Sequence, residues 1–180
     1  MPATYLALLR GINVGGKNKL PMKDLIGIFA ESGCEDVRSY IQSGNVIFGA
    51  APGVAAELPV RVAARIAARF GYRTPVVLRT AAELAAIIAG NPFLEAGCAE
   101  DELHVYFLAD RPDPVRVGQL DPDRSPPDRF SVSGREIYLR LPDGMGRTRL
   151  TNAYFDTKLA TTSTARNWRT VTKLLELMGG

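Results

Sequence analysis

Histidine and cysteine are scarce in this chain of 180 residues, which holds one histidine and two cysteines. The single histidine leaves few candidates for a general base. Cys34 and Cys98 lie far apart and lack the spacing of a metal site, so we interpret both as reduced, buried thiols of a cytoplasmic protein. We expect no metal and no cofactor.

Long apolar runs are also absent, and neither sign of charge dominates. No stretch approaches the roughly twenty apolar residues that a membrane-spanning helix needs, and the first ten residues lack the pattern of a signal peptide. We therefore expect no membrane partner. The 22 Lys and Arg against 19 Asp and Glu give a net charge of +3 and a pI near 9.0. This mild excess favours anionic partners, but a dedicated nucleic-acid binder usually has a stronger basic bias.

Hydrophobic periodicity divides the first half into strands and helices in the order β-α-β-β-α-β-α. The predicted elements span residues 5–9, 21–33, 37–42, 45–48, 59–71, 74–79 and 80–89. Ser43-Gly44 is expected to form a tight turn and residues 49–53 a loop. The first six elements have the order of a ferredoxin-like unit, in which we expect the first and third strands to lie parallel at the sheet centre. The loop after the first strand then lies at one end of the sheet and the Ser43-Gly44 turn at the other.

The second half repeats this order. Strands are predicted at 103–109, 129–132, 136–141 and 160–163, and helices at 112–120, 149–159 and 166–178. The hairpin Ser43-Gly44-Asn45-Val46-Ile47-Phe48 is echoed by Ser133-Gly134-Arg135-Glu136-Ile137-Tyr138 at the same place. The predicted fold class is α+β, with two tandem ferredoxin-like (βαββαβ) subdomains from an internal duplication, each followed by an extra helix. The predicted subdomains span residues 1–92 and 101–180.

A glycine-rich, cationic stretch follows the first predicted strand. Residues 10–19 read Arg-Gly-Ile-Asn-Val-Gly-Gly-Lys-Asn-Lys, and Gly11 to Lys17 match the G-x-x-x-x-G-K spacing of a phosphate-binding loop. Asn18 stands where that loop needs Ser or Thr to bind magnesium, and no later strand ends in the required aspartate. We therefore predict a simpler anion-binding loop, whose glycines turn N–H groups toward the ligand. Its candidate ligand-binding residues are Arg10, Asn13, Lys17, Asn18 and Lys19.

A second polar cluster is predicted in the second half. The glycine-containing loop 142–148 precedes a helix that Thr148 can cap, which places Arg147 beside free backbone N–H groups. An ordinary capped turn explains the same residues. Arg166 and Asn167 stand at the predicted start of the last helix, a position suited to ligand contact, whereas Trp168 is expected in the core.

Two other features have simpler explanations. The stripe of Arg61, Arg65 and Arg69 is explained by a solvated helix face. His104 is predicted in a strand with no nucleophile or orienting acid beside it, so we interpret it as structural.

Four separated motifs resemble the bacterial family catalogued as domain of unknown function 1697. They are Leu8-Leu9-Arg10-Gly11-Ile12-Asn13-Val14-Gly15-Gly16-Lys17-Asn18, Tyr40-Ile41-Gln42-Ser43-Gly44-Asn45-Val46, Leu141-Pro142-Asp143-Gly144 with Gly146-Arg147, and Thr164-Ala165-Arg166-Asn167-Trp168 running into Thr170-Val171-Thr172-Lys173-Leu174. The resemblance implies an α+β architecture of two ferredoxin-like subdomains and implies no activity.

Three functional hypotheses follow. The first is a binding module for a phosphate-bearing ligand, either a nucleotide or a nucleic-acid backbone. The second is a small transferase or hydrolase acting on a phosphorylated substrate, with Lys17 and an arginine stabilising developing charge. The third is a protein-interaction module whose polar motifs are structural. In the third case the motif side chains are buried and bonded to backbone groups.

Overall fold

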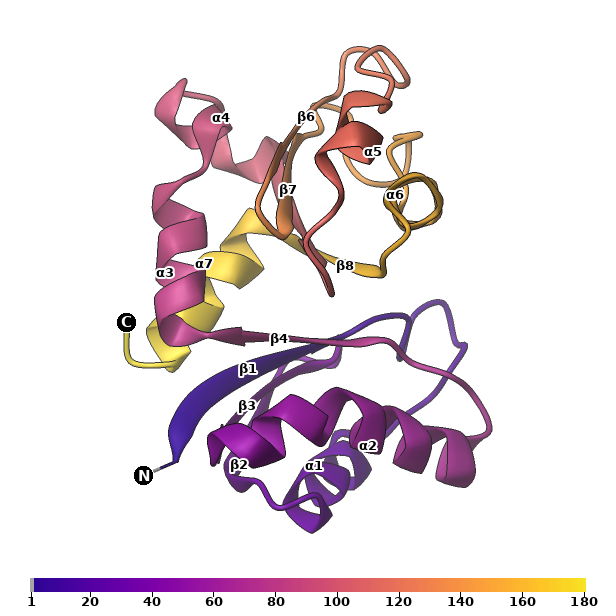
Figure 1. Cartoon of the computed structure of the whole chain (residues 1–180), viewed down its shortest axis with the longest axis vertical. Coiled ribbons are helices and arrows are strands. Elements are labelled where there is room, and N and C mark those ends of the chain that lie inside the picture. Colours follow the sequence, from indigo (N-terminus) through magenta and orange to yellow (C-terminus); the bar gives the residue numbers. More distant parts are fainter. Residues whose placement is uncertain (1) are drawn as a thin grey trace. The chain divides into compact units, whose positions relative to one another are not determined.

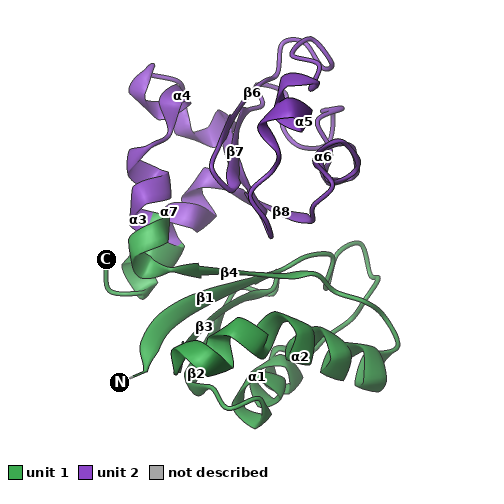
Figure 2. Cartoon of the chain, in the orientation of Figure 1, with its two compact units in different colours: residues 1–84, 174–180 green, residues 85–173 purple. Residues whose placement is uncertain are grey.

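A computed structural model describes residues 2–180 of the chain (Figure 1). The fold is mixed α+β, with two four-stranded antiparallel sheets and helices. The chain divides into two compact units (Figure 2): residues up to 84 with 174–180 form unit 1, and residues 85–173 form unit 2. The subdomain limits predicted at 1–92 and 101–180 stay a prediction.

Unit 1 contains the first sheet and the helices that follow its strands. Its strands are β1 (Ala3–Leu9), β2 (Glu35–Tyr40), β3 (Asn45–Ala50) and β4 (Val76–Thr80). Its helices are α1 (Met22–Glu31), α2 (Pro52–Phe70), the start of α3 (Ala81–Ala89) and the end of α7 (Trp168–Leu177). The predicted Thr80 cap of α3 is confirmed, because the Glu83 N–H donates to Thr80 Oγ1 at 3.1 Å.

The sheet of unit 1 has the strand order β2-β3-β1-β4. The first and third strands are therefore neighbours near the sheet centre, as expected, but the prediction that they run parallel is wrong. β1 and β3 are antiparallel, with Leu8 opposite Asn45 and Ala3 opposite Ala50. The reason is geometric: α1 returns the chain so that β2 runs parallel to β1, and the tight hairpin then reverses β3.

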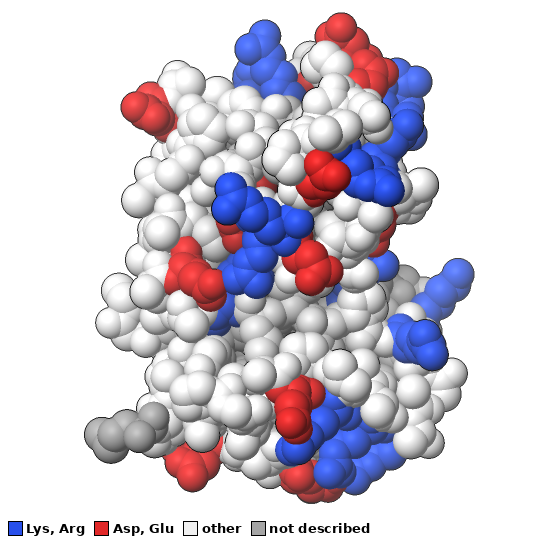
Figure 3. All heavy atoms as spheres, in the orientation of Figure 1, with Lys and Arg blue, Asp and Glu red and all other residues white. Residues whose placement is uncertain are grey.

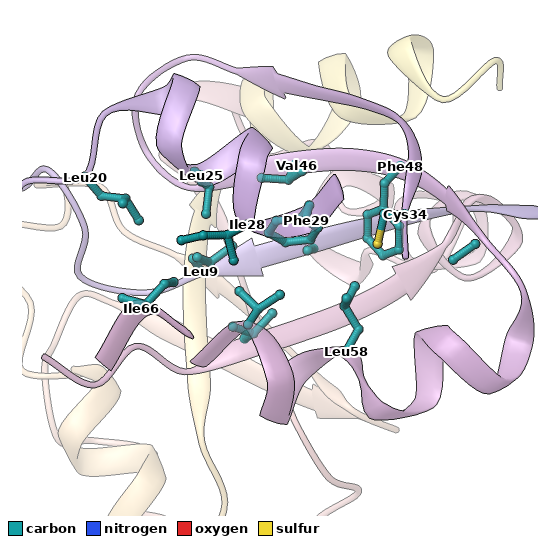
Figure 4. Packing of buried hydrophobic residues seen from close by; sticks show 14 of the residues in the cluster. Leu9, Leu20, Leu25, Ile28, Phe29, Cys34, Val46, Phe48, Leu58 and Ile66 are labelled. Carbon is teal, nitrogen blue, oxygen red and sulfur yellow. The ribbon is translucent and has the colours of Figure 1, made fainter. Parts of the chain in front are cut away.

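The core of unit 1 lies between one face of this sheet and the helices α1 and α2 (Figure 4). In α1 the buried residues Leu25, Ile28 and Phe29 recur at helical spacing, and Leu9 of β1 faces the same cluster. Each fully buried Leu, Ile or Phe side chain contributes about 1.5–3 kcal/mol relative to an exposed one. This burial fixes the end of β1, from which the glycine-rich loop leaves.

Helix α2 begins earlier than predicted. β3 continues to Ala50 and α2 starts at Pro52, so the expected loop at residues 49–53 and a helix start near Pro59 are both wrong. Pro59 lies inside the helix. The two turns that precede it bury Ala55 and Leu58 in the same core, and this burial offsets the hydrogen bond that proline removes.

Unit 2 contains the second sheet. Its strands are β5 (Leu103–Leu108), β6 (Arg129–Ser133), β7 (Glu136–Arg140) and β8 (Ser163–Asn167), in the order β6-β7-β5-β8. Its helices are the end of α3, α4 (Pro92–Glu95), η1 (Glu100–Glu102), α5 (Pro114–Gly118), α6 (Asn152–Leu159) and most of α7 (Trp168–Leu177). The two sheets have the same strand order: in each, the second strand lies at one edge, followed by the third, the first and the fourth.

The core of unit 2 is aromatic around Phe155 of α6. Tyr106, Phe130 and Tyr154 have ring centroids 5.6, 5.4 and 5.2 Å from that of Phe155, in edge-on arrangements. The contacts with Tyr106 of β5 and Phe130 of β6 hold α6 on one face of the sheet.

Three predictions for the last third of the chain are wrong. Thr151, not Thr148, caps α6, since Thr151 Oγ1 accepts the Tyr154 N–H at 3.2 Å. The predicted strand at 160–163 is mostly a turn, because Ala160 ends α6 in the left-handed conformation at φ 53°. Arg166 and Asn167 belong to β8, and α7 begins at Trp168. The prediction that Trp168 lies in the core is confirmed, with 1% of it exposed.

No helix within residues 2–180 combines the length and apolar character that a membrane crossing requires. In the same range, no three His, Cys, Asp or Glu residues are grouped so as to hold a metal ion.

Candidate functional site

The hairpin turn and the glycine-rich loop lie at the same end of the unit 1 sheet. The Leu9 N–H donates to the Gly44 carbonyl at 2.9 Å, so the turn borders the point where β1 enters the loop. The prediction that they lie at opposite ends is wrong, because it assumed parallel β1 and β3. Two motifs separated by about thirty residues of chain thus form one surface.

Gly44 allows this close approach. Its φ of 79° lies in the left-handed region, and an added Cβ would lie 2.9 Å from the Leu9 Cβ and 3.0 Å from the Leu9 carbonyl oxygen. Real Cβ atoms do not tolerate such contacts, so no other residue fits here without movement of the backbone.

The hairpin turn also contains a strained residue. Ile41 has φ 49°, a conformation that β-branched residues rarely adopt and that costs of order 1–3 kcal/mol. The Asn45 side chain helps to hold the turn by donating to the Tyr40 carbonyl at 3.2 Å and to Ser43 Oγ at 3.0 Å. Ile41 is 51% exposed, so its own burial does not offset the strain.

Asn13 fastens the loop to its surroundings. Its Nδ2 donates to the carbonyls of Leu20 at 2.9 Å and Gln42 at 3.2 Å, and its Oδ1 accepts the Leu20 N–H at 2.8 Å. These three bonds tie the loop to the start of α1 and to the hairpin turn. Asn13 is therefore a structural residue of the site, since its amide is engaged by the chain itself.

Asn18 closes the loop from the other side. Its Nδ2 donates to the Gly11 carbonyl at 2.9 Å, and its carbonyl accepts the Tyr72 hydroxyl at 3.1 Å. Asn13 and Asn18 both have left-handed backbones, at φ 54° and 49°, which Asn tolerates better than most residues. The sequence did not identify Tyr72 as part of this site.

The two lysines of the loop are exposed to solvent. Lys17 and Lys19 are exposed, and within residues 2–180 their ammonium groups form no hydrogen bond or ion pair. Arg10 is half-buried and its backbone N–H donates to the Pro75 carbonyl at 3.2 Å. Of the five predicted loop residues, the two lysines thus have exposed ammonium groups without a partner among residues 2–180.

A cavity of about 340 Å³ lies beside this loop at the start of α1. It is lined by Asn13, Gly16, Lys19, Leu20, Pro21, Met22 and Gln42. Pro21 at the N-cap position of α1 offers no side-chain acceptor, so the first turn lacks the capping bond that Ser or Asp supplies. Its N–H groups and the helix dipole favour an anion at this place. Asp24, which is also in the first turn, is exposed and does not line the cavity.

Three of the four residues of the second predicted cluster, Thr148, Arg166 and Asn167, are engaged by other residues of unit 2. Thr148 Oγ1 accepts the Leu150 N–H at 3.0 Å, and Asn167 Oδ1 caps α7 by accepting the Thr170 N–H at 2.8 Å. Arg166 donates to Thr164 Oγ1 at 2.8 Å and to the Ala165 carbonyl at 2.7 Å. Burial lowers the pKa of Arg166 to about 10. Arg147 is exposed.

The family of the chain follows from a comparison of sequences. The profile of a family described as "Protein of unknown function (DUF1697)" matches residues 3–138, which is more than half of the chain. The chain belongs to this family. The matched range contains the glycine-rich loop and the hairpin turn and ends before Arg147.

A solved structure gives the same fold. The chain is similar to the conserved bacterial protein SP0830 from Streptococcus pneumoniae, with 22% identity, a TM-score of 0.75 and 99% of each chain covered. At this identity the similarity shows the fold alone. No curated protein matches the sequence.

Proposed function

We propose that this protein binds a phosphate-bearing ligand at the loop end of unit 1. The observation that carries the proposal is the cavity at the uncapped start of α1, with Lys19 in its lining and Lys17 on the same loop, both without an internal charge partner among residues 2–180. A phosphate there receives hydrogen bonds from backbone N–H groups and charge from an ammonium group, and each charge-assisted bond is about twice as strong as a neutral one.

The cavity favours a nucleotide or a similar small phosphorylated molecule over a nucleic-acid backbone. Its volume of about 340 Å³ suits one phosphorylated group. On the face drawn in Figure 3, basic side chains are interspersed with acidic ones and with wide uncharged areas. A nucleic-acid backbone would be complemented by a continuous basic stripe.

Binding is better supported than catalysis. The cavity lining contains no Asp, Glu, His or Cys, so the lining offers no general base and no thiol nucleophile. Lys19 can stabilise charge, but charge stabilisation without proton transfer does not define a hydrolase or transferase.

We also propose that each unit is a ferredoxin-like βαββαβ subdomain and that the two arose by internal duplication. The shared strand order of the two sheets and the helix that follows β4 and β8 support this. A cytoplasmic location is supported by Cys34 and Cys98, which are free thiols.

Thermal unfolding with defined ligands tests the binding proposal. Inorganic phosphate, AMP and ATP are compared with adenosine, which lacks phosphate. At about ten times its Kd a ligand adds roughly 1.4 kcal/mol of stability, which raises Tm by about 3–6 °C for a chain of this size. We expect this shift with AMP or ATP and none with adenosine.

Lysine variants test whether the nucleotide-dependent rise in Tm comes from binding at this loop. Lys19→Ala is expected to abolish the nucleotide shift and Lys17→Ala to reduce it. Lys158→Ala removes the same charge from an exposed position of α6 in unit 2, and it should keep the full shift. A shift of equal size in Lys19→Ala, or no shift in the unmodified protein, would refute a phosphate site at this loop.

A further inference from the structure

A second cavity, of about 540 Å³, lies in unit 2. Its lining brings together η1, β5, the loop before α6 and the start of α7. The residues are Glu100, Asp101, His104, Gly144, Met145, Asn167, Trp168, Arg169 and Thr172. The strand register explains part of this arrangement, because His104 of β5 pairs with Asn167 of β8, the residue before α7.

His104 is the chain's only histidine, and it is buried beside this cavity with 9% of its surface exposed. Its Nδ1 atom is buried and has no hydrogen-bond partner among residues 2–180. Burial lowers the pKa of His104; the nearby Glu102 carbonyl opposes this shift, although no hydrogen bond of acceptable geometry joins it to Nδ1. A buried polar atom without a partner costs about 1–3 kcal/mol, so its place at a cavity requires an explanation.

Opposite charges line the same cavity without neutralising each other. Glu100 and Asp101 are exposed on η1, and Arg169 is exposed in the first turn of α7. No ion pair or side-chain hydrogen bond connects any of the three to another residue in the described part of the chain. Both signs of charge therefore remain available to a bound molecule.

We propose that this cavity binds a small zwitterion that carries one ammonium and one carboxylate group, the chemistry of a free amino acid. Arg169 binds the carboxylate, since its guanidinium matches that group in two parallel hydrogen bonds. Glu100 and Asp101 bind the ammonium. The His104 ring closes the buried side of the cavity, and Met145, which is 39% exposed, supplies apolar contact for the side chain of the ligand.

The chemistry is selective because each charged group of the ligand finds an unpaired opposite charge. A simple carboxylate leaves Glu100 and Asp101 unpaired, and a simple amine leaves Arg169 unpaired. A zwitterion satisfies both sides at once. This site is independent of the phosphate site, which lies in unit 1.

The single histidine makes the test direct. In protein labelled with nitrogen-15, one imidazole gives one set of ring signals, whose shifts report the environment of both ring nitrogens. The probes are free L-amino acids, tested singly, with propionate and ethylamine as carriers of one charge. Each is added to about 10 mM, which fills roughly nine-tenths of a site with a Kd of 1 mM.

We expect at least one amino acid to move the His104 ring signals in a saturable way, whereas propionate and ethylamine leave them in place. Arg169→Gln and Glu100→Gln should each weaken that binding about tenfold or more. Arg111→Gln removes an exposed arginine of unit 2 that does not line the cavity and should leave it unchanged. The backbone amide spectrum of each variant verifies the fold.

Three results would overturn the proposal. The first is no change of the ring signals with every amino acid. The second is unchanged binding by Arg169→Gln in a protein with an intact amide spectrum. The third is an equal response to propionate, which would make the site a simple carboxylate site. None of these depends on the response of Lys19→Ala to nucleotides, so the two proposals fail or survive separately.

Discussion

The amide of Asn13 and the missing side chain of Gly44 set the geometry of the candidate site. Asn13 makes three hydrogen bonds to the backbone of Leu20 and Gln42, and Gly44 leaves room for Leu9. Both residues act through contacts within unit 1. These two residues hold the loop against the hairpin turn and so fix the place from which the exposed Lys17 and Lys19 extend.

Substitution of Gly44 tests this close packing. Gly44→Ala adds a methyl group 2.9 Å from the Leu9 Cβ at a left-handed position, so we expect a loss of about 1–3 kcal/mol in the free energy of unfolding. Urea denaturation measures it. Gly53→Ala is the matched control, because the added Cβ has no neighbour within 4 Å and the residue lies in the first turn of α2.

Gly53→Ala should be neutral or stabilising by up to about 1 kcal/mol, because alanine is the better helix former. Equal effects of the two substitutions would contradict the steric role assigned to Gly44.

At the level of elements, α2 shows how packing overrides a local signal. A proline normally ends or begins a helix, yet α2 extends for a full seven residues before Pro59. Ala55, Leu58, Val62 and Ile66 all face one core, so the turns on both sides of the proline are held by the same buried stripe. Local propensity placed the start of the helix too late.

Replacement of Pro59 measures the cost of this proline. Pro59→Ala restores an N–H group inside the helix, and we expect the free energy of unfolding to rise by about 1–3 kcal/mol. Urea denaturation provides the value. Pro52→Ala, at the first turn of the same helix, should change it by less than about 1 kcal/mol because that N–H has no helical partner. A destabilised Pro59→Ala protein would show that the ring itself is needed for packing.

At the level of the whole molecule, charge is balanced. The net charge of +3 is spread over 180 residues, and acidic groups offset many basic ones: Glu31 forms ion pairs with Arg65 and Arg69, and Glu57 with Arg61. The arginine stripe of α2 is thus a set of solvated surface ion pairs, each worth less than about 1 kcal/mol. It offers little free charge to a polyanion.

Duplex DNA should therefore bind poorly. For a random duplex of about 20 base pairs at 150 mM salt, we expect a Kd weaker than about 10⁻⁴ M, the weak end of non-specific binding. Fluorescence anisotropy of a labelled duplex measures it, with the nucleotide-dependent Tm shift of the same preparation as the positive control. Micromolar binding that falls steeply with added salt would instead favour a nucleic-acid backbone as the ligand.

The local chemistry of the sequence determined the order of the elements, the core position of Trp168, the Thr80 cap and the glycine-rich loop itself. These depend on residues a few positions apart, through side-chain periodicity, capping and backbone freedom. The five residues predicted in this loop include Lys17 and Lys19, which are exposed.

Only the tertiary structure decided which segments meet. Because β3 runs antiparallel to β1, Gly44 lies next to the loop. Long-range hydrogen bonds of Asn13 and Asn18 hold that loop in place. Arg166 is buried in β8 and does not stand at the start of α7, and His104 lies beside a cavity. Each of these facts depends on contacts between distant parts of the chain, whose register is set by packing of the whole sheet and not by any local run of residues.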